Sequence, residues 1–219
     1  MRTAEDLALL LHDPESGAPL VDSSSLPRAL AGAVVLQLVL DDRARLEDRR
    51  WNTHLVIGDR GTTGDHVLDL ALERLPADPT PKAAIEKLQS RIKDPLMAGL
   101  VHDGSVRLEE RTFLGIPRSP LYPAVDRRRR DAVAARMRSV LVDGVAPGAD
   151  DAALVALLRA VKAEHKVVPE GQVPKRALRD RSKVIAEGEW AGEAVRKAIA
   201  DLYAAVAVAA GAGAAASGG

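Results

Sequence analysis

Apolar and polar positions follow the period of an α-helix along much of the chain. In the stretch TGDHVLDLALERL, apolar side chains from Leu68 to Leu75 recur at positions i, i+3, i+4 and i+7, which places them on one face of a helix. Asp65, or Thr63 before it, is suited to accept the free amide hydrogens of the first turn. The pattern therefore predicts a capped amphipathic helix over 65–75.

The same criterion predicts helices in most other segments. We expect them from Thr3 to about residue 11, from Pro27 to Leu40, from Pro81 to a break or kink at Pro95, from Leu96 to Val101, from a cap at Asp126 to Leu141, and over 154–161, 175–187 and 189–209. The portion Ala31–Leu40 is apolar on nearly every side, so this helix is expected to be the central and most buried one.

Two segments have a pattern that indicates short strands. Leu46–Asp59 carries β-branched and aromatic residues among charged ones, which predicts one or two strands in a hairpin. A second hairpin is predicted with Val106–Leu108 against Thr112–Leu114, turning at Glu109–Glu110. The proline-rich segment 117–123 after it is expected to be a rigid loop.

Composition supports a helical fold. Hydrophobic residues make up 47% of the 219 residues but aromatic residues only 2%, so the core must consist of Ala, Leu, Val and Ile. This favours helix–helix packing, because strands are enriched in aromatic and β-branched residues. We predict a mainly α, single domain over 1–209 with one or two β-hairpins. The low-complexity end, 210–219, is predicted to be a disordered Gly/Ala/Ser tail.

The sequence has few of the patterns that accompany catalysis. It contains no cysteine, its five histidines share no metal-ligand spacing, and GDRGTTGD lacks the Gly-Lys-Ser/Thr of a phosphate-binding loop. No nucleophile, base and oxyanion site come together in the pattern. We therefore expect neither an enzyme, nor a cofactor, nor a metal site.

The apolar segments are short for a membrane protein. The longest strongly apolar run, Ala31–Leu40, is interrupted by Gln37 and is well below the roughly 20 residues of a membrane span. The first residues include Glu5 and Asp6 where a secretory leader would be basic. We expect a cytoplasmic protein that associates with membranes peripherally.

The net charge of zero conceals a segregation of charge along the chain. From Arg107 to Arg138 nine residues are basic and four acidic, and from Arg159 to Lys183 eight are basic and three acidic, a balance of +5 in each segment. Such segregation can steer a polyanion to one face. The densest run, Arg127, Arg128, Arg129 and Arg130, lies at the start of a predicted helix, where phosphate groups bind well. The alternative is a solvated arginine run that reflects codon usage in a GC-rich genome.

Two kinds of polyanion fit these segments. The helix and hairpin over 96–116 are similar in order to a winged helix, which would bind nucleic acid, although the preceding helix carries acidic residues. A membrane surface is the other candidate, with Phe113, Leu114 and Ile116, or Leu121 and Tyr122, in the lipid interface. A third hypothesis is an interaction protein whose hairpin serves oligomerisation.

Five segments together resemble the Golgi phosphoprotein 3 family, and in particular its actinobacterial relatives. They are LALLLHDPESGAPL, ALAGAVVLQLVL, TGDHVLDLALERL, LVHDGSVRLEERTFLG and LVDGVAPGADDAALVALLRAV. The resemblance extends from about Thr3 to Ala207. It implies a single, mainly helical domain with a protruding β-hairpin. Eukaryotic members bind phosphatidylinositol 4-phosphate on Golgi membranes and serve as adaptors for cytoplasmic tails of membrane glycosyltransferases, so the resemblance implies similar partners here.

The family's head-group pocket uses one tryptophan and three arginines, and this sequence keeps it only in part. The tryptophan position falls at Asp22, and the arginine positions fall at Ala31, Ser90 and Lys93. An aspartate in place of the tryptophan would repel a phosphate. Helical spacing indicates that Arg28 and Arg91 are placed to supply the missing cations. The expected head-group residues are therefore Arg28, Arg91 and Lys93, together with the arginine run 127–130.

Overall fold

The computed structural model describes residues 3–168, 173–187, 197 and 199–208. In chain order, the elements are α1 (Thr3–Leu10), α2 (Ser25–Leu40), β1 (Ala44–Asp48), β2 (Thr53–Ile57), α3 (His66–Arg74), α4 (Pro81–Leu88), α5 (Lys93–His102), β3 (Glu109–Phe113), β4 (Ile116–Leu121), α6 (Arg128–Leu141), α7 (Ala149–Ala160), the short 3-10 helix η1 (Glu164–Lys166) and α8 (Lys175–Glu187). Residues 199–208 are also helical. The predicted class, mainly α with one or two β-hairpins, is confirmed, and the described residues form two such hairpins.

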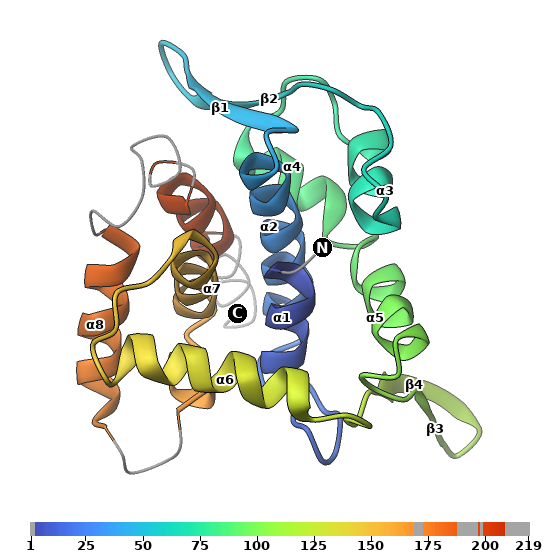
Figure 1. The fold of residues 1–219 in the computed structure, drawn as a ribbon. Helices are drawn as coiled ribbons and strands as arrows, with labels where there is room; N and C mark the ends of the chain where they lie inside the picture. Colours follow the sequence, from blue (N-terminus) through green and yellow to red (C-terminus); the bar gives the residue numbers. More distant parts are fainter. Residues whose placement is uncertain (1–2, 169–172, 188–196, 198, 209–219) are drawn as a thin grey trace, which may run out of the picture.

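Helix α2 is the centre of the fold, as its apolar pattern predicts. It runs through the middle of the molecule with α1 against its lower part in this view and α7 beside it, α6 crosses below, and α3 and α5 lie on the side opposite α8 (Figure 1). Twelve of its sixteen residues are buried. At Gly32 a Cβ atom would lie 2.6 Å from a methyl group of Val206, so the absence of a side chain lets the C-terminal helical residues pack closely on α2.

The local signals at helix ends are largely confirmed. The Asp65 carboxylate accepts hydrogen bonds from the backbone amides of Val67 (2.9 Å) and Leu68 (3.2 Å), which caps α3 as predicted. Asp126 likewise accepts from the amide of Arg128 at 2.9 Å, although α6 begins one residue later than the predicted cap implied. These bonds depend only on neighbours in the chain, which is why the sequence reveals them.

The helix prediction around Pro95 needs revision. Pro95 does not break a helix but lies in the first turn of α5, where a missing amide hydrogen costs nothing, and the interruption falls between Leu88 and Lys93. The last predicted helix, 189–209, lies partly outside the described residues, as does the predicted tail, 210–219.

The first hairpin agrees with its prediction. Strands β1 and β2 pair antiparallel from Ala44 opposite Ile57 to Asp48 opposite Thr53, so residues 49–52 form the loop. β2 is also held on its other edge, since the amides of Leu55 and Ile57 donate to the carbonyls of Pro79 (2.7 Å) and Ala77 (2.9 Å). The hairpin projects at the top of Figure 1.

The second hairpin differs from its prediction. Its strands are β3 and β4, with Phe113 opposite Ile116, and the turn lies at Leu114–Gly115 rather than at Glu109–Glu110. The predicted rigid loop 117–123 consequently begins as a strand, and the prolines of that strand, Pro117 and Pro120, have no amide hydrogen to donate. Both turn residues have positive φ, +51° at Leu114 and +77° at Gly115, which is a backbone that leucine rarely adopts. The sequence therefore lacks the usual signal at this turn.

The base of the second hairpin is fixed to the loop between α1 and α2. The amide of Tyr122 donates to the carbonyl of Gly17 at 3.1 Å, and the amide of Ala124 donates to the carbonyl of Pro14 at 3.0 Å. Gly17 has φ +68°, and a Cβ atom there would overlap the backbone of Tyr122 and Pro123. The close contact holds the hairpin in place while its tip projects from the body.

Candidate functional site

The tip of the β3–β4 hairpin is the most prominent apolar feature of the surface. Phe113, Leu114 and Ile116 are adjacent there and are 58%, 86% and 62% exposed. Scattered exposed apolar side chains are normal, but three on one projecting turn form a patch that indicates contact with another apolar phase. Leu114 also adopts the left-handed conformation at a cost of about 1 kcal/mol, and such strained residues gather at functional sites.

Two arginines flank this apolar tip. Arg111 and Arg118 lie directly opposite each other in the register, and the Arg118 guanidinium carbon is 5.5 Å from the centre of the Phe113 ring. Like charges at facing positions repel, so this arrangement does not serve the stability of the hairpin. Among the described residues, no carboxylate forms an ion pair with either arginine. Both charges are therefore available to an anion next to the apolar tip.

The residues predicted to contact a membrane differ in their exposure. Phe113 and Leu114 are exposed as expected, whereas Leu121 is half-buried at the end of β4 and Tyr122 is only 7% exposed. The Tyr122 ring lies edge-on to His12 with centroids 6.0 Å apart, so it belongs to the core and is not available to a membrane. Arg111 and Arg118 were not predicted, because only the correct turn position places them opposite each other.

Each arginine of the run 127–130 is close to a carboxylate. The pairs are Arg127 with Glu15 (3.7 Å), Arg128 with Asp126 (2.7 Å), Arg129 with Glu5 (2.6 Å) and Asp6 (3.0 Å), and Arg130 with Asp131 (3.4 Å). The run thus points in several directions and is largely neutralised from within the chain. Its position at the start of α6 is better explained by structure than by a bound phosphate.

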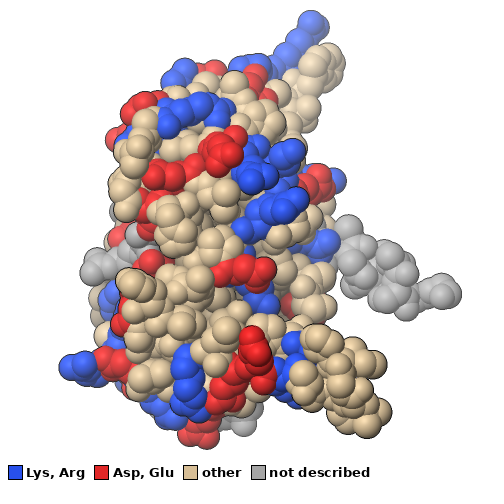
Figure 2. Space-filling model, turned by 90° about the vertical axis from the view of Figure 1, so that its right-hand side faces the viewer, with Lys and Arg blue, Asp and Glu red and all other residues tan. Residues whose placement is uncertain are grey.

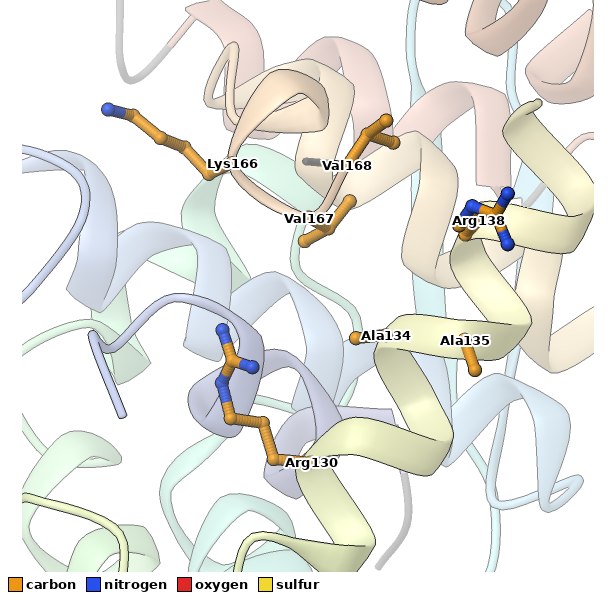
Figure 3. A pocket seen from close by; sticks show the side chains of 7 residues that line it. All are labelled: Arg130, Ala134, Ala135, Arg138, Lys166, Val167 and Val168. Atoms are coloured by element: carbon orange, nitrogen blue, oxygen red, sulfur yellow. The ribbon is translucent and has the colours of Figure 1, made fainter. Parts of the chain in front are cut away.

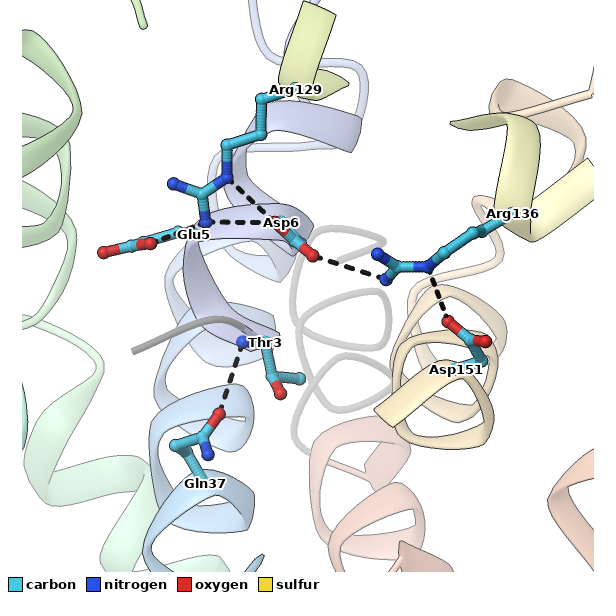
Figure 4. A network of polar contacts seen from close by, with 7 residues as sticks. All are labelled: Thr3, Glu5, Asp6, Gln37, Arg129, Arg136 and Asp151. Carbon is cyan, nitrogen blue, oxygen red and sulfur yellow. Dashed lines mark hydrogen bonds and ion pairs between the residues drawn. The ribbon is translucent and has the colours of Figure 1, made fainter. Parts of the chain in front are cut away.

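Arg129 belongs to a network that joins three helices (Figure 4). The buried carboxylate of Asp6 in α1 accepts from Arg129 Nε at 3.1 Å and from Arg136 Nη2 at 3.4 Å, both on α6. Arg136 also donates to Asp151 of α7 at 2.9 Å. Burial alone lowers the pKa of Arg129, but its bonds to Glu5 and Asp6 outweigh that effect and the pKa lies above its usual value. The network therefore fixes α6 across the ends of α1 and α7.

The other predicted cations lie at the N-terminal part of α2 and between α4 and α5. Arg28 Nε donates to the side-chain oxygen of Gln89 at 3.1 Å, which brings Arg28 to the segment that carries Arg91 and Lys93. Its Nη1 atom is buried without a hydrogen-bond partner. Within the described part of the chain, none of these three cations forms an ion pair. They form a second basic surface, distinct from the arginine run.

Asp22, two residues before the N-cap residue Ser24, accepts hydrogen bonds at the start of the helix that carries Arg28. Its Oδ1 atom accepts from the amides of Ser24 and Ser25, both at 2.9 Å, and from the Ser24 hydroxyl at 2.6 Å. These bonds from Ser24 and Ser25 hold the pKa of Asp22 well below its usual value. The N-terminus of α2 is therefore already occupied by an internal, fully charged carboxylate, which disfavours a phosphate at that point.

A cleft of about 320 Å³ lies between α6 and the end of η1 (Figure 3). It is lined by Arg130, Ala134, Ala135, Arg138, Lys166, Val167 and Val168. Lys166 extends away from the two arginines of α6, and Arg138 already lies 4.0 Å from Asp143. The cations border the cleft without converging on one point, so it is a weaker candidate than the hairpin.

The described residues contain neither a cluster of metal-ligating side chains nor a membrane-spanning helix. No group of three or more His, Asp or Glu side chains there is placed to hold a metal ion. No helix in the same part of the chain combines the length and the apolar character needed to cross a bilayer.

A comparison with models of protein families identifies the family of the chain. The family model described as Golgi phosphoprotein 3 (GPP34) matches residues 4–202. The chain belongs to the Golgi phosphoprotein 3 family. A search of curated proteins found no match. The match covers α1 from its second residue through α8 and the first part of the helical residues 199–208, so the family assignment applies to nearly all of the described fold and includes both hairpins.

Proposed function

We propose that this member of the Golgi phosphoprotein 3 family is a cytoplasmic, peripheral membrane protein that binds anionic phospholipid. The observation that carries the proposal is the β3–β4 tip, where Phe113, Leu114 and Ile116 are exposed beside two arginines that pair with no carboxylate of the described residues. Apolar side chains enter the interface of a bilayer while neighbouring cations meet lipid phosphates. The strained turn at Leu114 supports the proposal because it presents a leucine where glycine or asparagine would be more stable.

Arg28, Arg91 and Lys93 are proposed to contribute a second electrostatic contact. Among the described residues these cations form no ion pair with a carboxylate, so their charges are available to an anion. Asp22 stands where the family's tryptophan is expected and is held in its charged form. We therefore propose a preference for anionic phospholipids in general, with phosphatidylinositol 4-phosphate as one such ligand rather than a uniquely selected one.

An adaptor role is the remaining part of the proposal. Family membership supports it, and the partners would be cytoplasmic tails of membrane proteins that lie on the same membrane surface. Nucleic acid is a weaker candidate because a winged helix would need a polar, base-reading or phosphate-binding tip, whereas the tip here is apolar.

Co-sedimentation with vesicles tests the proposal. Vesicles of phosphatidylcholine alone would be compared with vesicles that also contain phosphatidylglycerol or phosphatidylinositol 4-phosphate, at low and high salt. We expect binding that requires anionic lipid and weakens with salt. Binding that is independent of anionic lipid, or absent at low salt, would refute the proposal.

The variant Leu114→Asn sharpens the test. Asparagine tolerates positive φ, so the turn keeps or gains stability while the most exposed apolar side chain is lost. Partial burial of a leucine contributes about 1 kcal/mol, so we expect roughly fivefold weaker vesicle binding. Val184→Ala, at a residue 59% exposed on α8, is the matched control and is expected to bind normally. Sedimentation of the protein alone would reveal self-association through the same tip, which is the alternative use of this patch.

A further inference from the structure

The loop of the first hairpin carries an exposed tryptophan. Trp51 lies within residues 49–52, between β1 and β2, and is 82% exposed. The indole ring is large and apolar with a single polar N–H, a combination that favours the boundary between lipid and water. Neither the family description nor the second hairpin accounts for a tryptophan at this position.

Its neighbour gives the loop a positive charge. The guanidinium carbon of Arg50 is 5.3 Å from the centre of the Trp51 ring, and Arg50 forms no ion pair with any carboxylate in the described part of the chain. Arg49, by contrast, is bound to Asp78 at 2.5 Å and helps to hold the loop. The loop thus offers an aromatic ring and one available cation, the same pairing that Phe113 and Arg118 make on the other hairpin.

The base of this hairpin is firmly attached. Asp48 is bound to Lys197 at 2.8 Å, and His54 Nδ1 lies 3.1 Å from Asp78. Together with the backbone bonds from β2 to residues 77–79, these contacts hold the hairpin against the body on both sides. The exposed tip is therefore carried by a rigid support rather than by a loose loop.

The tips of the two hairpins lie at opposite ends of the molecule. In Figure 1 the β1–β2 tip is at the upper left and the β3–β4 tip at the lower right. In Figure 2, where the molecule is turned by 90°, the projecting parts at the top and at the bottom both lie toward the right-hand side of the view, and Lys and Arg side chains lie on the visible face at heights between them. The two tips can therefore face one extended surface on that side of the molecule.

We infer that the β1–β2 loop is a second contact with the same anionic membrane. Trp51 enters the head-group region, and Arg50 meets a lipid phosphate beside it. The inference rests on the proposed function, since it assigns a second anchor to a protein that is already on a membrane. Charge complementarity selects an anionic lipid surface as the occupant, because an aromatic ring next to an unpaired arginine matches an apolar phase bordered by phosphate.

Two rigidly linked tips would act together. Once the β3–β4 tip is inserted, the second tip meets lipid as an intramolecular event at high effective concentration. Two separated contacts also fix the orientation of the body on the membrane, which a single tip does not. Removal of either tip is therefore expected to weaken binding without abolishing it.

Tryptophan fluorescence tests the inference directly. The chain contains two tryptophans, Trp51 and Trp190, so Trp190→Phe leaves Trp51 as the only one. This variant would be titrated with phosphatidylcholine vesicles with and without phosphatidylglycerol, and with vesicles whose acyl chains carry bromine as a quencher. We expect a shift of Trp51 emission to shorter wavelength and quenching by brominated lipid, both only with anionic vesicles.

Affinity measurements complete the test. Trp51→Ala is expected to bind anionic vesicles about tenfold more weakly and to melt like the wild type, because its side chain is exposed. Val145→Ala, at a residue 53% exposed in another loop, should bind normally.

The outcomes separate the inference from the proposed function. Vesicle binding with unchanged Trp51 emission and normal affinity of Trp51→Ala would overturn the inference and leave the proposed function standing. Absence of vesicle binding would overturn both. An emission shift that depends on protein concentration without vesicles would overturn the lipid contact in favour of a second copy of the chain.

Discussion

Replacement of Asp6 by alanine should destabilise the fold strongly. The Asp6 carboxylate is 2% exposed and accepts three hydrogen bonds, two from Arg129 at 3.1 and 3.0 Å and one from Arg136 at 3.4 Å. Loss of one partner of a buried ion pair costs about 3–5 kcal/mol, because the remaining charge is left without compensation. Where the cost falls within this range depends on the partners that the two arginines keep.

The two arginines would not be left entirely unpaired. Their side chains are 34% and 39% exposed, and they keep Glu5 at 2.6 Å and Asp151 at 2.9 Å. The cost should therefore fall at the lower end, about 3 kcal/mol. For a chain of this length each kcal/mol lowers the melting temperature by about 2–4 °C, so Asp6→Ala should melt about 6–12 °C below the wild type.

Thermal and urea unfolding followed by circular dichroism would measure this effect. The control is Asp180→Ala, which removes an exposed pair with Arg176 at 3.9 Å on α8 and should change the unfolding free energy by less than about 0.5 kcal/mol. If Asp6→Ala and Asp180→Ala had the same melting temperature, ion pairs with Asp6 would not explain the position of the arginine run.

Three further predictions concern the basic surfaces, the hairpin base and the α2 cap. Arg28→Ala should weaken binding to anionic vesicles about fivefold. Arg129→Ala should instead lower the melting temperature and leave vesicle affinity within about twofold. The reverse pattern would show that the arginine run, and not Arg28, binds the lipid head group. Gly17→Ala should lower the unfolding free energy by more than about 2 kcal/mol, against about 1 kcal/mol for Gly64→Ala, where φ is also positive but nothing lies within 4 Å; equal losses would contradict the close contact. The pKa of Asp22 is lowered in the folded state, so the stability it contributes is fully present above its unfolded pKa of about 4 and is lost as pH falls toward the lowered value. Asp22→Ala should therefore lower the unfolding free energy by about 1 kcal/mol at neutral pH and by progressively less below pH 4. A loss of unfolding free energy that does not change with pH would refute this role.

The sequence predicts features that depend on near neighbours. The cap at Asp65 and the apolar stripe of α3 are both present, because a helix and its first hydrogen bonds involve residues within four positions of one another. The burial of α2 is predicted for a similar reason, since its composition leaves no polar face to expose. The fold class could therefore be inferred from pattern and composition.

The turn and the ion network could not be predicted in this way. The β3–β4 turn contradicts the usual preference for glycine or asparagine at positive φ, so Leu114 gave no signal for it and the predicted register was displaced. Arg129 meets Glu5 and Asp6 across more than 120 positions of the chain, and only the packing of α6 on α1 brings them together. The arginine run was predicted to be a ligand site because the carboxylates that pair with Arg127 and Arg129 lie far away in the sequence.

The prolines of β4 limit the ways in which the protruding hairpin can associate. Pro117 and Pro120 withhold two amide hydrogens from the strand, so another chain that aligned along it would find gaps in the backbone ladder. The pairing of further chains along β4 into a larger sheet is therefore disfavoured, although the hairpin carries exposed Phe, Leu and Ile side chains. Along β4, the backbone thus resists extension into a larger sheet while the apolar side chains of the hairpin stay exposed, which favours contact with the hairpin through its side chains.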